Sequence, residues 1–499
     1  MKTYTIRLVP LAKTIAVREG TRLLDVLHEY GIEFPCGGQG RCGKCKIRVL
    51  EGEIDADPHH RRRLRLLGLP ESWRLSCLST CNSDLVLEVA QYETIIQADE
   101  TTFEFTPGRG LGIAFDLGTT TLVGQLLDLE TGKILAVEKA MNPQLKLGSD
   151  LVTRLESALA NGPGEATRLI REKVGSMVEQ LMAGRSEAAE RMVIVGNTVM
   201  HHFFCGLDIA PLSFFPFQSP HLEMARFSPG ELGWNRTGCD RVYFYPPIGS
   251  FVGSDILAGI LATGMHQKEA MTVLVDLGTN GEIVAGNRDA LVCASTAAGP
   301  AFEGAVISSG MQATQGAISS VVREGKGWTC AVIGDTEPAG ICGSGLIDAI
   351  AVMLEQGLLG EFGEIRSGDG EVQLKAPVSL TQKDIQEFQL AKAAISTGLQ
   401  ILLRRLSITL DEVDQLYISG GFGSYINPEN VRKTGMIDLP AEKISRLGNT
   451  ALIGAKMFLF EEVSEAGEIR NLTTHVSLES EPDFQDLFIQ QLSFECIKK

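Results

Sequence analysis

The alternation of apolar and polar residues divides the chain into a short β-rich segment and two longer units that mix strands with helices. TYTIRLVP at 3–10 and KTIAVREG at 13–20 alternate with period two and predict two strands. TRLLDVLHEYG at 21–31 has helical spacing and ends at glycine. KCKIRVLEG at 44–52 and LVLEVAQYE at 85–93 predict two further strands. These patterns predict a small module over residues 1–92.

A pattern of strand, tight turn and return strand begins at residue 111 and occurs twice. LGIAFDLGTTTLVGQLLDL at 111–129 and MTVLVDLGTNGEIVAG at 271–286 share it, which indicates an internal repeat of about 160 residues. Residues 93–110 contain Pro107, Gly108 and Gly110 and are expected to form a linker. We expect two subdomains over 111–265 and 266–499, with a C-terminal segment of the second returning to the first.

The two turns have the chemistry of a phosphate site. Hairpin turns of Gly and Thr offer amides and hydroxyls to phosphate oxygens, and an Asp at a strand end can hold Mg²⁺, usually through water. Asp116 and Asp276 are therefore the candidate catalytic carboxylates. The candidate nucleotide contacts are Gly118, Thr119, Thr120, Thr121, Gly278, Thr279, Asn280 and Gly281. Two such hairpins facing each other would hold one polyphosphate from both sides.

Three cysteines in the loop FPCGGQGRCGKC, followed by a distant fourth, predict a [2Fe–2S] ligand set. Cys36, Cys42 and Cys45 follow C-x5-C-x2-C, and 31 residues separate Cys45 from Cys77. The glycines of the loop allow tight turns and amides aimed at cluster sulfurs. Cys81 competes with Cys77 as fourth ligand. Structural zinc would favour paired C-x2-C units, and a disulfide framework fits poorly with a long chain lacking a signal peptide.

Composition and charge exclude several classes of function. The 499 residues have 44% apolar content, and no apolar run approaches the roughly 20 residues of a membrane span, so a cytoplasmic protein is expected. A formal charge of −17 argues against a general nucleic-acid binder. HHRRRLR at 59–65 is a basic exception. It is interpreted either as a solvated face or as a docking patch for an acidic redox partner.

Further segments add candidate contacts. Asn197 follows the apolar strand MVIVG and could position water or phosphate, or cap the next helix. Gly343, Ser344 and Gly345 begin a helix, where they could contact a ribose or phosphate or allow tight packing. His201 and His202 are interpreted as structural, and the remaining cysteines show no metal spacing.

The paired DLGT and DLGTN turns resemble those of the actin, sugar-kinase and Hsp70 ATPase superfamily. LYISGGFGSYI at 416–426 is similar to its adenosine motif, which implies nucleotide contacts at Gly420, Gly421 and Phe422. Segments 246–264 and 446–459 resemble its two connecting helices, with small residues at Gly253, Ala258, Gly259, Gly454 and Ala455. The first module resembles a β-grasp ferredoxin, where R-L-x-C favours Cys77 as ligand. The expected fold is thus a β-grasp ferredoxin domain followed by a two-domain, ribonuclease H-like actin-type ATPase.

The combination resembles the reductive activators of corrinoid proteins, including AAGPAFEGA at 297–305 and SEPDFQDLFIQQLSF at 480–494. This resemblance implies ATP- and Mg²⁺-dependent electron transfer from the [2Fe–2S] cluster to Co(II) of a corrinoid partner, an upstream low-potential donor and a homodimer. The chain is expected to be a short form without the additional linker and middle domains. The alternatives are a redox-regulated small-molecule kinase, an ATP-driven activator of a non-corrinoid enzyme and a chaperone or cluster-delivery protein.

Overall fold

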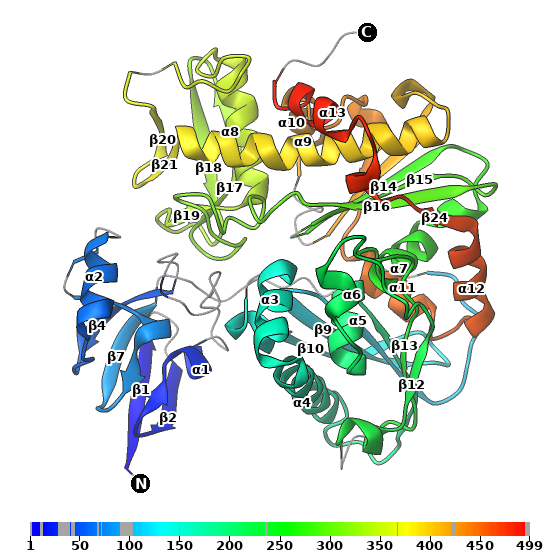
Figure 1. The fold of residues 1–499 in the computed structure, drawn as a ribbon, viewed down its shortest axis with the longest axis horizontal. Coiled ribbons are helices and arrows are strands. Elements are labelled where there is room, and N and C mark those ends of the chain that lie inside the picture. The colour runs from blue at the N-terminus through cyan, green and yellow to red at the C-terminus, as the bar shows by residue number, and fades with distance from the viewer. Residues whose placement is uncertain are drawn as a thin grey trace.

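The computed structural model describes residues 2–9, 13–27, 40, 45–66, 69–70, 72–89, 103–148, 150–234, 238–278, 280–366, 368–420 and 426–494. The chain forms a small N-terminal module and two larger sheet-based subdomains (Figure 1). None of the helices in these ranges has both the length and the apolar character needed to cross a membrane.

The N-terminal module is built on a five-stranded sheet with the order β2-β1-β7-β4-β5. Its strands are β1 (Thr3–Val9), β2 (Lys13–Arg18), β4 (Lys46–Glu51), β5 (Trp73–Leu75) and β7 (Leu85–Val89). β3 (Thr21–Arg22) pairs with β6 (Thr80–Cys81), and the helices are α1 (Leu24–Leu27) and α2 (Pro58–Leu66). Inward-facing Ile6, Leu8, Ile47 and Leu87 are fully buried. The strands that the period-two pattern predicts are confirmed.

The first large subdomain has a six-stranded sheet with the order β10-β9-β8-β11-β13-β12. The strands are β8 (Leu111–Leu117), β9 (Thr121–Asp128), β10 (Ile134–Met141), β11 (Ala189–Val195), β12 (Ala225–Phe227) and β13 (Val242–Phe244). The helices are α3 (Leu151–Asn161), α4 (Gly164–Leu181), α5 (Thr198–Cys205) and α6 (Ala210–Ser213). The buried residues of α4 share one core with Phe115, Ile194 and Phe244 of the sheet.

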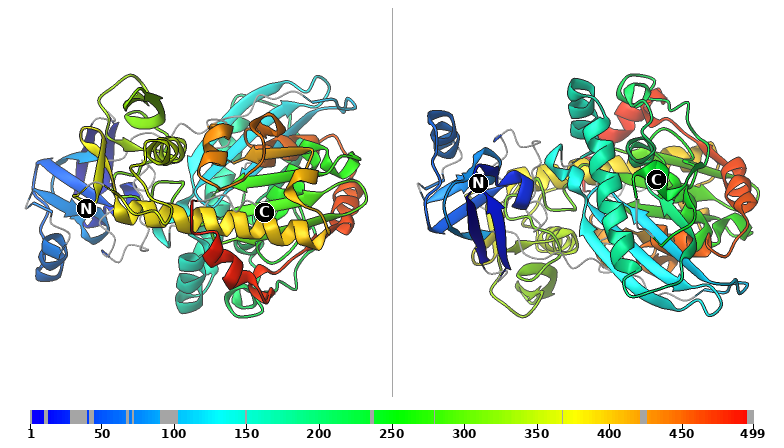
Figure 2. Two further views of the ribbon diagram at one scale, coloured as in Figure 1. Left: turned by 90° about the horizontal axis from the view of Figure 1, so that it is seen from above. Right: turned by 90° about the horizontal axis from the view of Figure 1, so that it is seen from below.

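The second large subdomain has a sheet with the order β23-β22-β14-β15-β16-β24. Its strands are β14 (Thr272–Leu277), β15 (Gly281–Gly286), β16 (Leu291–Thr296), β22 (Gln415–Ser419), β23 (Ile444–Arg446) and β24 (Thr473–His475). The long helix α9 (Gln382–Arg405) runs along this subdomain beside α8 (Gly343–Glu355) (Figures 1 and 2). The smaller elements are α10 (Pro428–Lys433), α13 (Phe484–Gln490), β17 (Ala317–Glu324), β18 (Gly327–Val332), β19 (Gly340–Ile341), β20 (Glu371–Lys375) and β21 (Val378–Thr381).

The two sheets repeat one topology, as the sequence repeat predicts. In each sheet two antiparallel hairpins are followed by two parallel strands, so β8, β11 and β13 correspond to β14, β22 and β23. The register also corresponds, because Asp116 pairs with Val195 and Asp276 pairs with Ser419. The repeat therefore places both candidate carboxylates at the carboxyl ends of equivalent central strands.

Two helices cross where the subdomains meet. α7 (Ser254–Thr263) and α11 (Thr450–Met457) pack against each other, and α12 (Val463–Leu472) follows. A Cβ added at Gly454 would lie 2.6 Å from the Ala258 Cα, so glycine is needed for this approach. Leu257 and Leu452 share a core with Ala114 of the first sheet and Leu274 of the second. The chain thus returns to the first subdomain at α11, and β24 then pairs with β16 in the second.

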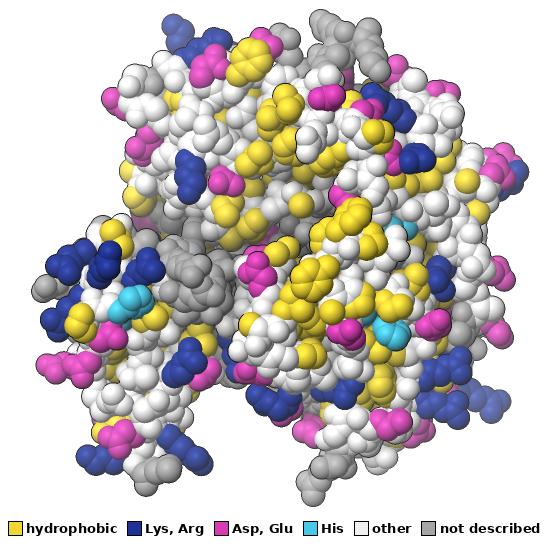
Figure 3. Space-filling model, viewed as in Figure 1, with side chains coloured by type: hydrophobic (Ala, Val, Ile, Leu, Met, Phe, Trp, Pro, Cys, Tyr) yellow, Lys and Arg dark blue, Asp and Glu magenta, His cyan; other side chains and the backbone are white. Residues whose placement is uncertain are grey.

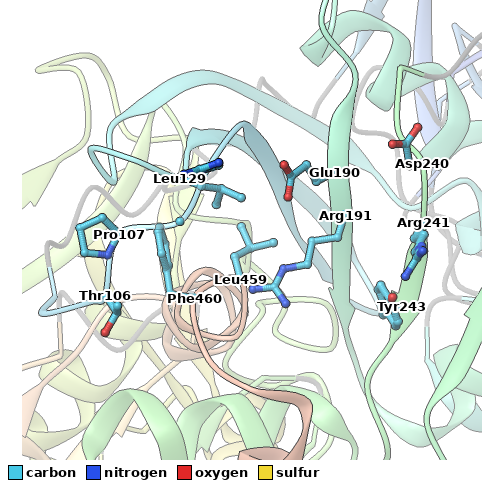
Figure 4. Close-up of a pocket in the computed structure, with 12 residues that line it drawn as sticks. Thr106, Pro107, Leu129, Glu190, Arg191, Asp240, Arg241, Tyr243, Leu459 and Phe460 are labelled. Carbon is cyan, nitrogen blue, oxygen red and sulfur yellow. The ribbon is translucent and has the colours of Figure 1, made fainter.

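The segment that the sequence assigns to a linker is partly packed. Phe103 and Phe105 contact Phe460 with ring centroids 5.7 and 4.4 Å apart, and the Gly108 amide donates to the Leu129 carbonyl. Residues 103–110 therefore belong to the packed first subdomain, because their aromatic side chains cover apolar surface beyond α11. Beside them is an open pocket of about 640 Å³ between Pro107, Phe460 and Arg191 (Figure 4).

Candidate functional site

The cysteine site is described at two of its four predicted ligands. Cys45 immediately precedes β4, and Cys77 lies in the 3₁₀ turn Ser76–Leu78 after β5. Their Sγ atoms are 3.2 Å apart, and both residues are almost fully buried. The Ser76 amide and hydroxyl both donate to the Cys45 carbonyl, which holds the two segments together. Cys36 and Cys42 lie outside the described residues.

This geometry fits joint ligation of an iron–sulfur cluster. The sulfurs of Cys45 and Cys77 lie at close approach, as two ligands of one cluster must. Gly40 has a φ of +68°, and a Cβ there would lie 2.6 Å from Leu78 Cδ1, beside the Cys77 turn. Cys81 instead bonds the Ser83 carbonyl at 3.3 Å, and burial raises the pKa of its thiol. The geometry therefore favours Cys77 over Cys81.

Hydrogen bonds from distant residues hold the backbone carbonyls of the first phosphate hairpin, residues 118–121. Asn142 Nδ2 donates to the Gly118 carbonyl at 2.8 Å, and the Asn142 amide donates to the Thr120 carbonyl at 2.8 Å. Buried Arg154 donates to the Thr119 carbonyl at 2.6 Å. No hydrogen bond within the described part of the chain uses the Thr119 or Thr120 amides. With the carbonyls bound on one side, these amides remain as donors for an anion.

Asn197 joins this hairpin to the next strand. It caps α5, where its Oδ1 accepts from the Met200 amide at 3.0 Å, and its Nδ2 donates to Thr119 Oγ1 at 2.9 Å. The Thr119 hydroxyl oxygen therefore acts as an acceptor in this contact. Gly253, before α7, lies so close that a Cβ there would be 2.7 Å from the Asn197 carbonyl carbon. The structure thus confirms the capping role and adds a direct contact with the hairpin. Thr121 is the first residue of β9 and pairs with Met141.

The second hairpin repeats the arrangement. The Gly278 amide donates to the Asn280 carbonyl at 3.0 Å, and Gly281 begins β15. Gly420 follows the last residue of β22 and has a φ of +95°, and a Cβ there would lie 2.9 Å from Asp276 Oδ1. Glycine therefore allows the backbone to approach this carboxylate closely. Thr279, Gly421 and Phe422 lie outside the described residues.

Four carboxylates gather at the ends of these strands and at the start of α7. Asn449 Nδ2 donates to Asp116 Oδ2 at 2.6 Å, and Ser419 Oγ donates to Asp276 Oδ2 at 2.7 Å. Asp255 is in the first turn of α7. Glu282, in β15, accepts from Ser295 Oγ at 3.2 Å. The strand ends of both subdomains therefore contribute negative groups to one site.

Burial and mutual repulsion raise the pKa values of these carboxylates. Desolvation raises the pKa of Asp116 to about 7, against the opposing hydrogen bond from Asn449. Desolvation and then the charges of Asp276 and Asp116 raise the pKa of Asp255 to about 8. Desolvation raises the pKa of Asp276 and, with neighbouring carboxylates, that of Glu282. Such a site favours a cation that neutralises it.

The residues present fit Mg²⁺ in the form that accompanies nucleotides. Within the described ranges, no three His, Cys, Asp or Glu side chains are arranged to hold a metal by themselves. Mg²⁺ usually keeps several waters and takes one or two carboxylates with phosphate oxygens. Asp116 and Asp276 are the carboxylates that the two hairpins would supply beside a phosphate chain.

The surroundings of residues 343–345 fit the second of their two sequence interpretations, which is tight packing. Gly343 and Gly345 are packed against the backbone of Phe302 and Ile318, and a Cβ on either would lie within about 3 Å of the carbonyl carbon. Ser344 is buried and donates to the Ser319 carbonyl at 2.8 Å. The packing alternative therefore accounts for these residues, because their surfaces contact β17 and its neighbours.

Several residues of the site were missed by sequence reasoning. Asp255 and Glu282 lie within segments interpreted only as a helix and a return strand, although VGSD and TNGE both place an acid beside a small-residue turn. Arg154 lies outside every motif, and Asn449 lies in the segment 446–459, which was interpreted only as a connecting helix. His202 confirms its structural role, since its ring nitrogens bond the Asp208 carbonyl and Ser219 Oγ, both at 2.7 Å.

Comparison with family models divides the chain into three matched regions. Residues 7–82 match the 2Fe-2S iron-sulfur cluster binding domain. Residues 111–268 match the RACo middle region, and residues 270–498 match the C-terminal domain of RACo, described as the ASKHA domain. The expectation that a middle domain is missing is therefore wrong. The residues that the sequence assigns to the first ATPase subdomain, on the basis of its phosphate hairpin, are the middle region.

Two relatives and one solved structure match over more than three quarters of the chain. The corrinoid activation enzyme RamQ of Eubacterium limosum is 29% identical, with 97% of this chain and 98% of the relative covered. The [Co(II) methylated amine-specific corrinoid protein] reductase of Methanosarcina barkeri is 29% identical over 77% of both chains. A solved structure, a reductive activator for corrinoid, iron-sulfur protein, aligns with a TM-score of 0.69 and 27% identity over 98% of both chains. The chain belongs to the family of reductive activators of corrinoid proteins.

Proposed function

We propose that this protein uses ATP to drive electron transfer from a [2Fe–2S] cluster to the Co(II) centre of a corrinoid partner protein, restoring Co(I) for methyl transfer. The observation that carries the proposal is the union in one chain of a cluster-ligand module and two facing phosphate hairpins with opposed carboxylates. The cited relatives, which are named for corrinoid activation or reduction, support this assignment.

The N-terminal module would hold the cluster through Cys36, Cys42, Cys45 and Cys77. When bound, the cluster supplies a site that accepts and releases one electron. The residues of the module bury this site: Ile47, Leu75 and Leu87 pack around Cys45 and Cys77 in one core. They exclude water from the ligand side, and the Ser76–Cys45 hydrogen bonds keep the two sulfurs in place.

The two subdomains would bind ATP between their hairpins. The Thr119 and Thr120 amides and the Gly278–Gly281 turn would donate to phosphate oxygens, and Asp116 and Asp276 would face Mg²⁺. Gly420, Gly421 and Phe422 would lie along the nucleoside. Asp255, with its pKa raised to about 8, can accept or release a proton close to neutral pH and is the group we assign to orienting the attacking water.

The need for ATP follows from the redox energetics. Plant-type clusters have potentials near roughly −400 mV, and a more reducing acceptor makes the transfer uphill. For one electron, about 59 mV is a tenfold penalty, or about 1.4 kcal/mol. Nucleotide can offset this only by favouring a conformation that alters the acceptor. The crossing of α7 and α11 supports such a change, because these helices join both sheets to the carboxylate site.

The test is anaerobic visible spectroscopy of a Co(II) corrinoid protein mixed with this protein, a reductant and ATP. Co(I) should form only when ATP is present. Asp276→Ala should abolish this formation and leave the cluster spectrum intact. Asp289→Ala is the matched control, since Asp289 is exposed in the same subdomain and should act like the unaltered protein. Formation of Co(I) by Asp276→Ala at the normal rate would contradict the proposal.

A homodimer and a low-potential electron donor complete the proposal. Both follow from the family resemblance. Sedimentation of the holoprotein tests the dimer, which should have twice the mass of the 53.9 kDa chain.

A further inference from the structure

The proposed electron path leaves one strongly charged feature without a role. α2 carries Arg61, Arg62, Arg63 and Arg65 within nine residues. Arg61, Arg62 and Arg65 are exposed, and Arg63 is half-buried. Lys and Arg side chains gather on this side of the N-terminal module (Figure 3). The chain therefore presents a concentrated positive surface beside its cluster module.

No ion pair within the described ranges uses these arginines. Arg61 and Arg65 are separated by one helical turn, where like charges cost about 0.2–0.5 kcal/mol. The first turn of α2 has no acidic residue to oppose them. The four arginines of α2 thus lower the stability slightly through mutual repulsion, and they have no ion-pair partner within the described chain.

α2 is nevertheless rigidly joined to the cluster site. Asp57 Oδ1 accepts from the His60 amide at 2.7 Å and caps the helix. His60 Nε2 accepts from the Leu75 amide at 2.9 Å, two residues before Cys77. Leu64 is buried in the same core as Cys45 and Cys77. A protein held on the exposed face of α2 is therefore close to the ligand-bearing turn.

The charge of the chain is divided unequally along its length. Residues 1–92 contain 14 Lys and Arg against 11 Asp and Glu, a formal charge of +3, whereas residues 93–499 contain 31 against 51, or −20. The four arginines of α2 are what make the module positive. An acidic protein is repelled by most of the molecule and attracted to this one surface.

We propose that the exposed arginine face of α2 is the docking surface for an acidic, low-potential electron-transfer protein that reduces the cluster. This inference rests on the proposed function and names the partner on its donor side. α2 lies at the outer edge of the module, on the far side from the first large subdomain (Figures 1 and 2). A donor needs no contact with the ATPase, whereas an acceptor whose reduction depends on ATP must contact it. The position of α2 therefore suits the donor. The transfer is one electron from the reduced partner to the oxidised cluster.

The test uses the full-length holoprotein and a reduced acidic ferredoxin as the probe donor. The variant is Arg61→Glu, Arg62→Glu and Arg65→Glu together. The matched control is Arg7→Glu, Lys13→Glu and Arg18→Glu, which makes the same charge change on exposed positions of β1 and β2 in the same module. Stopped-flow absorbance measures the second-order rate of cluster reduction at low and high ionic strength.

We expect the α2 variant to be reduced at least tenfold more slowly than the unaltered protein at low salt, since steering changes such rates by about 10–10³. The difference should shrink at high salt. The control should stay within about twofold. Equal rates for the α2 variant and the unaltered protein, or an equal loss in the control, would overturn the docking surface.

A second measurement separates this inference from the proposed function. All variants are first reduced photochemically with a neutral deazaflavin, and ATP-dependent Co(I) formation is then followed. The α2 variant should now act normally, because its donor step has been bypassed. A persisting loss would assign α2 to the acceptor and overturn the inference. Absence of Co(I) with the unaltered protein would refute the proposed function, while the donor rates would still test α2.

Discussion

The crossing of α7 and α11 gives the sharpest quantitative test of the structure. In Gly454→Ala, the added Cβ would lie 2.6 Å from the Ala258 Cα and closer still to the Ala258 carbonyl oxygen. Ordinary van der Waals contact begins at 3.4 Å, so the helices must separate by about 0.8 Å or more. Overpacking of this kind costs about 1–3 kcal/mol.

The higher helix propensity of alanine stabilises the variant and so opposes the effect of overpacking. A matched control variant cancels this propensity effect from the comparison. Alanine is favoured over glycine by about 1 kcal/mol inside a helix. Gly467→Ala makes the same change in α12, where a Cβ has no neighbour within 4 Å. The two variants should therefore differ by about 1–3 kcal/mol, with Gly454→Ala the less stable.

Differential scanning calorimetry of the holoprotein measures this difference, at about 2–4 °C per kcal/mol for a domain of 150–250 residues. Gly454→Ala should also bind ATP more weakly than Gly467→Ala. The reason is that α7 and α11 connect the two halves of the nucleotide site, and the added methyl group would push these helices apart. Identical midpoints for the two variants would show that the helices are not held in contact at Gly454, and the reasoning would fail.

Other predictions concern the carboxylates and the cysteines. Asn449→Ala removes the hydrogen-bond donor to Asp116, so the pKa of Asp116 should rise above about 7. The affinity for ATP at pH 7, measured by titration calorimetry, should then fall about tenfold or more. Unchanged affinity would count against this contact. Without nucleotide, Asp116 keeps its proton up to a pKa of about 7 when folded but releases it near 3.8 when unfolded, so stability should decrease as pH rises from about 4 to 7. Asp116→Asn should flatten this dependence in unfolding experiments between about pH 4 and 7, and an unaltered slope would refute the assignment. Cys77→Ser should lose the visible and paramagnetic signals of the cluster, whereas Cys81→Ser should retain them; the reverse result would exchange their roles.

The ligands and hairpins are recognisable from sequence because their chemistry depends on local spacing. Cys45 follows Cys42 at a distance that a single loop imposes, and Asp116 and Asp276 each end an apolar strand before a glycine turn. The repeat of about 160 residues likewise predicts two equivalent sheets, since similar patterns of period two form similar strands. The order of these local signals is sufficient for the fold class.

Contacts between segments that are distant in the chain cannot be predicted from local sequence patterns. Asn449 and Asp116 are 333 residues apart, and Arg154 reaches the Thr119 carbonyl from a separate helix. The same dependence on position explains why the sequence leaves two interpretations of Gly343 and Gly345 open, because a glycine that admits a ligand and one that admits a neighbouring backbone look identical in sequence.

By itself, the sequence determined the cluster module, the paired phosphate turns and the concentration of arginine at 61–65. The tertiary structure decided which of Cys77 and Cys81 lies beside Cys45, and it added Asp255 and Glu282 to the carboxylate site. It also placed the arginines on the outer face of the module. The physical reason is that spacing along a chain specifies local hydrogen bonding and periodicity, whereas burial, charge repulsion and exposure depend on which segments the whole fold brings together.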